Sequence, residues 1–296
     1  MVPTILAHPL RGIVRKNRVR SHRGGDKTPG SSIPGVSFGP ILDASLVYSD
    51  ERLVVINKPP GVSLATTRAA PHDAARRLVF SLPAETRAAN FPGSAPLWLV
   101  HRLDVGTTGL VLLARDEEMH RELSTLFSTR LVRKIYLALV WGHPRPRSGR
   151  FEWPLAPDTR DRRRMRVDPS GRSAATSFRT LACGPHVSLL ELQPATGRTH
   201  QLRVHLSHAG HWIVGDDLYG GARHRGVKEP DLQSLLNPPH LLLHAWRILL
   251  PESSNIMPKR FEAALPPHFA AVLESMGMLS ALVKFEIRGS KFDIRD

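Results

Sequence analysis

Short apolar runs separated by turn-forming residues dominate the chain from residue 41 onward. The run at 53–56 is rich in β-branched residues and ends at Asn-Lys-Pro-Pro-Gly, and a second apolar run spans 110–114. Both patterns predict buried strands that lead into turns. Further strands are expected at 135–141, 150–155, 164–168, 173–182 and 187–193. Strands at such short intervals, with few helices between them, favour a mostly antiparallel α+β sheet over a βαβ arrangement.

Helical spacing is confined to a few segments. A short helix is expected within 71–82, with a loop after it. A second is expected to begin at the acidic residues 116–118, whose charge suits a helix N-terminus. Residues 199–209 fit both a strand and a helix that Gly210 would end, and periodicity does not choose between them. A short apolar helix followed by a polar tail is expected at 271–296, and the sequence assigns these residues no role.

The charge balance points to a polyanionic partner. The chain has 296 residues with 41 Lys and Arg against 26 Asp and Glu, a net charge of +15. Such a surface fits nucleic acid, although an arginine-rich proteome would give the same balance. Within 1–40, seven cations face a single acid among five prolines and six glycines, which predicts a flexible basic arm rather than an Arg-rich transit peptide.

Several classes of chemistry find no support in the sequence. The single cysteine, Cys183, excludes an intrachain disulfide, and no apolar stretch reaches the about 18 residues of a membrane span, so a cytoplasmic protein is expected. The 15 histidines include no zinc signature, and no Gly-rich nucleotide cradle follows a strand, so neither a metal nor a cofactor is expected. The arginine-rich stretch 160–166 is interpreted as a phosphate contact rather than as a solvated loop.

Asp104 is the strongest candidate for a reactive group. It lies in a Gly/Thr-rich loop directly before the apolar run at 110–114. On local grounds, a carboxylate here is as easily a turn or cap residue as a catalytic group. The segments around it decide between these interpretations.

Five ordered motifs carry a resemblance to a known family. His101-Arg102-Leu103-Asp104 followed by 107–110 (Thr-Thr-Gly-Leu) resembles the HRLDxxTSGL motif of the RluA-type pseudouridine synthases, with Thr108 in place of the usual serine. The other motifs follow in the family's order at 57–61, 134–138, 196–206 leading into 215–220, and 243–245. The resemblance extends from about residue 44 to 252.

The resemblance implies a fold, a reaction and a set of site residues. It implies a mixed, largely antiparallel central sheet with flanking helices and a central RNA-binding cleft, in a catalytic domain at 41–270 without an S4 domain, and a helix from near Thr199. It also implies cofactor-independent conversion of uridine to pseudouridine, with Asp104 as the essential carboxylate, Tyr136 stacking on the base, and Arg203 paired with Asp104. Arg102 corresponds to the residue that fills the gap left by the extracted nucleotide. The remaining substrate-binding candidates in these motifs are His101, Thr107, Lys134, Arg198 and Lys58.

These residue types suit the implied chemistry. The reaction breaks the N1–C1′ bond, turns the uracil and joins C5 to C1′, and a carboxylate can attack C1′, attack C6 or remove the C2′ proton. Each route needs an ionised aspartate, which a neighbouring guanidinium favours. The uridine must also be flipped out of its stack. The expected partner is a single-stranded loop of 23S rRNA or tRNA. The protein itself is expected to be a monomer. A non-catalytic RNA-binding factor and an N-glycosylase that releases uracil remain alternatives.

Overall fold

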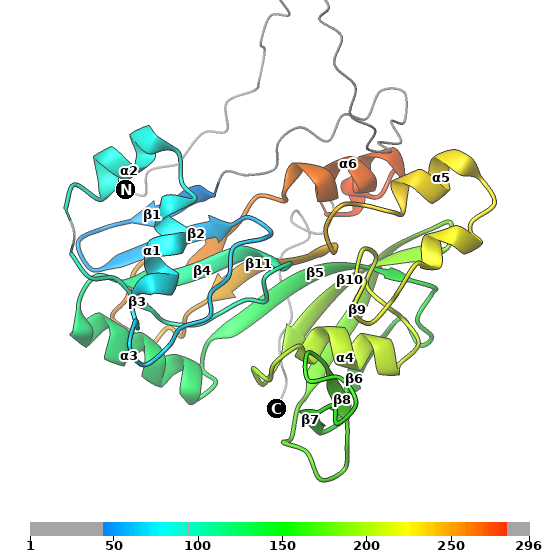
Figure 1. The fold of residues 1–296 in the computed structure, drawn as a ribbon, viewed down its shortest axis with the longest axis horizontal. Coiled ribbons are helices and arrows are strands. Elements are labelled where there is room, and N and C mark those ends of the chain that lie inside the picture. The colour runs from blue at the N-terminus through cyan, green and yellow to red at the C-terminus, as the bar shows by residue number, and fades with distance from the viewer. Residues whose placement is uncertain (1–43, 94, 283–296) are drawn as a thin grey trace, which may run out of the picture. The chain divides into compact units, whose positions relative to one another are not determined.

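A ten-stranded mixed sheet forms the centre of the protein (Figure 1). The computed structural model describes residues 44–93 and 95–282. The sheet runs in the order β1-β2-β4-β11-β5-β10-β9-β6, with β3 on β4 and β12 on β11. Its strands are β1 (Ser45–Ser49), β2 (Leu53–Lys58), β3 (Trp98–Leu99), β4 (Thr108–Ala114), β5 (Arg133–Trp141), β6 (Ser148–Phe151), β9 (Thr176–Gly184), β10 (Val187–Pro194), β11 (Leu243–Leu249) and β12 (Arg260–Glu262).

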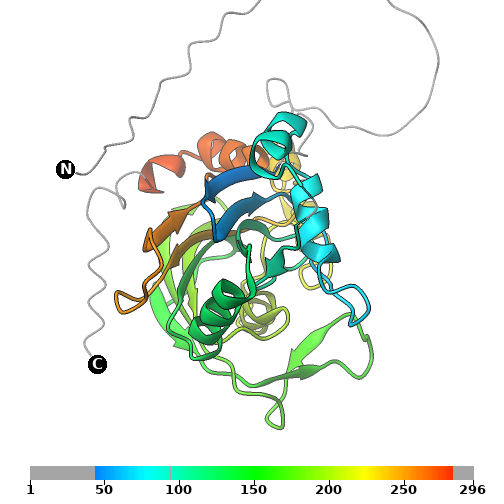
Figure 2. The ribbon, with the colours of Figure 1, turned by 90° about the vertical axis from the view of Figure 1, so that its left-hand side faces the viewer.

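Helices cover both faces of this sheet. They are α1 (Asp73–Phe80), α2 (Ala84–Asn90), α3 (Glu117–Ser128), α4 (Gln201–His208), α5 (Pro230–Leu235) and α6 (Pro267–Ser275), with a short 3₁₀ turn at Arg223–Gly226. The hairpin of β7 (Leu155–Pro157) and β8 (Met165–Val167) forms a separate two-stranded sheet (Figure 2). The predicted α+β fold, with its mixed and largely antiparallel sheet, is confirmed.

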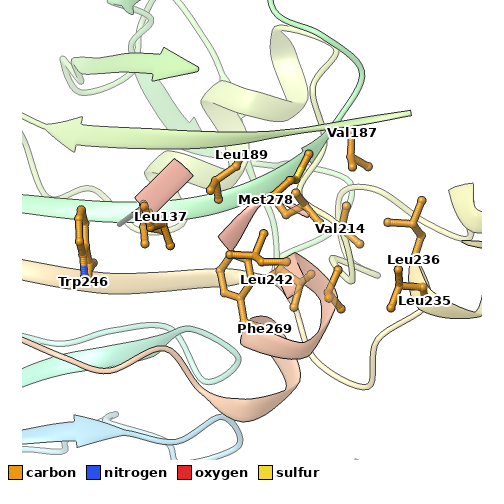
Figure 3. Close-up of a cluster of buried hydrophobic side chains, with 14 of the residues drawn as sticks. Leu137, Val187, Leu189, Val214, Leu235, Leu236, Leu242, Trp246, Phe269 and Met278 are labelled. Carbon is orange, nitrogen blue, oxygen red and sulfur yellow. The ribbon is translucent and has the colours of Figure 1, made fainter. Parts of the chain in front are cut away.

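Alternating side chains of the strands pack on different helices. On one half of the sheet, Val54 of β2 lies in a cluster with α1, while its neighbour Val55 lies in a cluster with α3. On the other half, Leu189 of β10 packs with Phe269 of α6 (Figure 3), and Leu190 packs with α4. Strands covered on both faces are apolar at every position, which explains the continuous runs in the sequence.

A parallel pair lies in the middle of the sheet, between β4 and β11. Thr108 is paired with His244, and Gly109 with Ala245. Among the described residues, the other strand pairs are antiparallel. His244 is fully buried, and its Nδ1 lies 2.9 Å from the Thr108 hydroxyl. The loop that carries Asp104 therefore enters the sheet at a junction fixed from both sides.

Several element boundaries differ from the sequence predictions. The loop expected after the first helix contains α2, and the strand expected at 150–155 is divided between β6 and β7. The ambiguous segment 199–209 forms a helix, α4, as the resemblance implied. Helix α6 begins at Pro267, and its buried Phe269 and Leu273 join a large core cluster, so a boundary after residue 270 would cut through this helix.

Parts of the predictions lie outside the described residues. These are the basic arm at 1–40 and the polar tail from 283 onward. Within 44–93 and 95–282, no helix has the length and apolar character needed to cross a membrane.

Candidate active site

A cavity of about 500 Å³ opens where the loop before β4, the end of α3, the start of β5 and the N-terminal part of α4 meet. Eight of the nine site residues predicted from the sequence line it. They are His101, Arg102, Asp104, Thr107, Lys134, Tyr136, Arg198 and Arg203. The folded chain thus gathers residues that are up to a hundred positions apart around one space.

Asp104 is held by a tight turn that leads into β4. The backbone N–H of Thr107 donates to the Asp104 carbonyl at 3.1 Å, and buried Thr107 closes the turn. Gly109, at the second position of β4, has φ of +111°, and a Cβ there would lie 2.3 Å from the Ala245 carbonyl oxygen. Glycine is needed here because β4 approaches the backbone of β11 too closely for a side chain.

Arg203 joins two carboxylates. Its Nε and Nη2 donate to both oxygens of Asp216, at 2.7 and 2.8 Å, and its Nη1 donates to Asp104 at 3.3 Å. Asp216 is buried, and it also accepts the backbone N–H groups of Leu218 and Tyr219. Burial acts to lower the pKa of Arg203, but the hydrogen bonds and charges of Asp216 and Asp104 outweigh it and raise that pKa above its ordinary value. The guanidinium therefore stays charged and is fixed in one orientation.

His200 and Tyr219 form a second connection to Asp104. His200 precedes α4 in a left-handed conformation, with φ of 53°. The Tyr219 hydroxyl accepts the backbone N–H of Met165 at 2.8 Å and lies 2.9 Å from His200 Nδ1. Burial lowers the pKa of His200, so its ring is neutral near pH 7. The two ring nitrogens of His200 thus face different partners, because Nδ1 lies beside the Tyr219 hydroxyl and Nε2 lies 3.9 Å from the Asp104 carboxylate.

Two ring side chains of the cavity lining, His101 and Tyr136, are uncharged. The His101 ring stacks on Phe127, with ring centres 4.6 Å apart, and its Nε2 accepts the backbone N–H of Leu112. Burial, reinforced by the charge of Lys134, lowers the pKa of His101 to about 3. Burial, reinforced by the charge of Asp104, raises the pKa of Tyr136 above its ordinary value. Both side chains are therefore neutral near pH 7.

Lys58 occupies a different place from the one expected of a substrate contact. It is fully buried and is not part of the cavity lining. Its ammonium donates to the carbonyls of Pro59, Val62 and Val105 at 2.8, 3.2 and 3.0 Å. Burial lowers the pKa of Lys58 to about 7, although the charge of Asp104 opposes the shift. Because Val105 directly follows Asp104, Lys58 supports the loop from beneath.

The other predicted contacts are three cations of the cavity lining. Arg102 is exposed, and its guanidinium reaches the Thr199 hydroxyl at 3.4 Å. Arg198 anchors its Nε on the Ser173 carbonyl at 3.1 Å. Lys134 is half-buried at the start of β5. All three cations are therefore within reach of a substrate that enters the cavity.

Sequence reasoning missed Asp216, His200 and Tyr219. All three lay within quoted motifs, yet none was given a role. Two adjacent acids at 216 and 217 offered a signal, but the choice of the buried one as the partner of Arg203 depends on the fold. Within the described part of the chain, no cluster of three or more His, Cys, Asp or Glu could hold a metal ion.

Known proteins resemble this chain in both sequence and fold. The family model described as RNA pseudouridylate synthase matches residues 52–208. An uncharacterized RNA pseudouridine synthase of Chloroflexus aurantiacus is 39% identical over 220 residues, which are 74% of this chain and 65%, just under two thirds, of that relative. Ribosomal large subunit pseudouridine synthase D of Pseudomonas aeruginosa is 34% identical, over 78% of this chain and 71% of its own.

The fold comparison agrees. The solved structure of human RNA pseudouridylate synthase domain containing 4 superposes with a TM-score of 0.60 at 29% identity, over 78% of this chain and 92% of that one. The fold and the sequence together define an RNA uridine isomerase. The chain belongs to the RNA pseudouridylate synthase family, and the predicted membership is confirmed.

Proposed function

We propose that this protein isomerises particular uridines of ribosomal RNA to pseudouridine, with Asp104 as its catalytic carboxylate. The observation that carries the proposal is the pairing of Asp104 with Arg203, at 3.3 Å, inside a cavity that Tyr136 also lines. A relative named as a ribosomal large subunit pseudouridine synthase supports ribosomal RNA as the substrate. Transfer RNA offers the same chemistry and enters the test below as a second substrate.

The charge arrangement suits a carboxylate that must react without losing its charge. Attack on C1′, attack on C6 and removal of the C2′ proton all need ionised Asp104. Two of the three guanidinium nitrogens of Arg203 are bound to Asp216, so the third nitrogen, Nη1, is held toward Asp104. This guanidinium therefore places a positive charge and a hydrogen-bond donor directly against the Asp104 carboxylate. The free uracil must stay bound between bond breakage and reattachment, and a cavity of about 500 Å³ gives it walls on which to stay.

The target uridine has to leave its stack to reach Asp104. Extracting a nucleotide costs a few kcal/mol, and less when it begins in an unpaired loop. Stacking on an aromatic side chain such as Tyr136 recovers about 1–3 kcal/mol. Exposed Arg102, near the cavity mouth, is placed to occupy the gap that the nucleotide leaves.

The direct test is Asp104→Asn, which keeps the size of the side chain and removes its charge. We expect pseudouridine formation to fall at least about a hundredfold, while RNA affinity is retained because a negative charge is lost. Pseudouridines are mapped by carbodiimide modification in ribosomal and transfer RNA from a deletion strain that carries either form. Asp217→Asn, which changes an exposed neighbouring acid, is the matched control.

Three outcomes would contradict the proposal. Near wild-type turnover by Asp104→Asn removes the catalytic role of this residue. Release of free uracil by the wild type, seen by chromatography, makes the protein an N-glycosylase. An unchanged pseudouridine map in the deletion strain leaves a non-catalytic RNA-binding factor.

A further inference from the structure

The end of the cavity nearest α3 carries a group of cations without acidic partners. Arg130, Lys134 and Arg198 line this end. Within 44–93 and 95–282, none of them forms an ion pair with a carboxylate. Asp104 is the one carboxylate among the described residues of the lining, and it faces Arg203. This end of the cavity is therefore positive throughout.

The cations also act on one another. Burial lowers the pKa of Lys134, and the charge of Arg130 lowers it further. Burial likewise lowers the pKa of Arg198, with added effects of Arg172 and Arg130. The Lys134 ammonium lies 3.9 Å from the point that a Cβ on Gly197 would occupy, so it sits beside the loop that carries Arg198. Like charges gathered in this way destabilise the free protein, and a bound anion would relieve the repulsion.

The backbone of Arg130 indicates that its side chain has a use. Arg130 follows the end of α3 with φ of +63°, in the left-handed region. Its N–H donates to the Phe127 carbonyl at 3.2 Å, and the next N–H donates to the Leu126 carbonyl. Helix ends of this shape prefer glycine, because other residues are strained there. An arginine here gains some favourable interaction with the helix C-terminus but keeps the strain of the left-handed backbone, and its side chain also reaches the cavity lining.

We propose that Arg130, Lys134 and Arg198 form a subsite for a backbone phosphate next to the everted uridine. The inference rests on the proposed function and adds a substrate group to it. Arg198 uses its Nε on the Ser173 carbonyl, which leaves its two terminal nitrogens for an anion. Guanidinium groups bind phosphate oxygens in pairs, and an ammonium binds them as a point charge. Arg130, which the motifs did not single out, gains a direct role in substrate binding.

The first experiment measures how salt affects RNA binding. The probe is an unmodified transcript of large-subunit ribosomal RNA. Its binding to the wild-type protein and to Arg130→Gln is measured by retention of the complex on filters. We expect the variant to bind about tenfold more weakly at low salt. We also expect the slope of log K against log salt to shrink by about 0.7–1. Arg121→Gln, an exposed arginine of α3 outside the cavity lining, controls for the loss of one charge.

A second pair of variants separates the phosphate role from a structural one. Arg130→Gly should raise Tm by about 2 °C, because glycine suits the left-handed position, and it should weaken RNA binding as Arg130→Gln does. Arg130→Lys should restore most of the affinity. Equal slopes for Arg130→Gln and Arg121→Gln, or full affinity in Arg130→Gly, would overturn the subsite. Pseudouridine formation at saturating RNA, measured on the same preparations, shows separately whether the proposed isomerase activity stands.

Discussion

At one end of the cavity Asp104, Arg203 and Asp216 hold one another at fixed distances, whereas at the Arg130 end the cations have no acidic partner among the described residues. Arg203 is held by Asp216 and reaches Asp104 at 3.3 Å. Lys134 and Arg130 only repel each other. The first arrangement has its geometry without RNA, whereas the proposed subsite takes its anionic partner from the RNA. Changes at the first end should therefore affect stability and turnover, and changes at the second should affect affinity and its salt dependence.

The largest effect is expected from Asp216→Ala. The change leaves the buried Arg203 guanidinium without its main partner. Removing one partner of a buried ion pair lowers the unfolding free energy by about 3–5 kcal/mol. Freed Arg203 would also lose its orientation toward Asp104, so turnover should fall. Urea unfolding and pseudouridine formation check the two effects. Asp217→Ala, at the exposed neighbour, should change stability by less than about 0.5 kcal/mol. Equal stability and activity in Asp216→Ala and Asp217→Ala would show that the Asp104 end of the cavity does not depend on its fixed ion pairs.

The next effect is a pH dependence introduced by Lys58. Its pKa in the folded protein is about 7, below the ordinary 10.5, so between these values the unfolded chain holds a proton that the folded chain lacks. Folding stability should therefore rise with pH across this window, by up to about 1.4 kcal/mol per unit. The stability penalty is complete below pH 7 and gone above 10.5.

The variant Lys58→Met isolates that contribution. It should flatten the rise, so that the stability of the wild type relative to the variant increases from pH 7 to pH 10. Urea unfolding at each pH measures the difference. A difference that stays constant with pH would show that burial of the Lys58 ammonium does not shift its titration.

The smallest effect is expected from Tyr219→Phe. The ring stays in place below the Arg203 guanidinium, 5.0 Å away, but the Met165 N–H and His200 Nδ1 lose their partner. Unfolding free energy should fall by about 1–2 kcal/mol. Turnover should also fall, because the His200 ring loses the hydroxyl contact that orients it beside Asp104. Tyr48→Phe, whose exposed hydroxyl donates to Asp50, is the matched control. A weaker salt dependence of RNA binding in Tyr219→Phe would place this residue with the phosphate contacts instead.

The sequence predicted the strands well because apolar runs covered on both faces leave a strong signal. The motifs also selected the site residues well, since eight of the nine line one cavity of the folded chain. The sequence did not predict α2, because this helix has no buried residue and therefore no apolar stripe. It also joined β6 and β7 into one strand, because 150–155 contains apolar residues on both sides of the break.

The partners of the charged residues were the harder part. The resemblance paired Arg203 with Asp104, but its closer partner is Asp216, 13 positions along the chain and buried. Lys58 was assigned to the substrate because it stood in a motif, whereas its burial assigns it to the loop of Asp104. Residue type and spacing do not show which side of a loop faces the cavity, because that depends on how strands distant in the sequence pack around the loop.

The parallel pairing of β4 with β11 ties the reactive loop to the order in which the polypeptide is made. Thr108 meets a partner 136 residues further along, so a growing chain that already contains Asp104 and Arg203 still lacks the strand beside them. Contacts between such distant segments form late, because a long loop must close first. A ribosome that has synthesised two thirds of this protein thus holds an unfinished enzyme, which acquires its capacity to alter RNA only when the last strands dock.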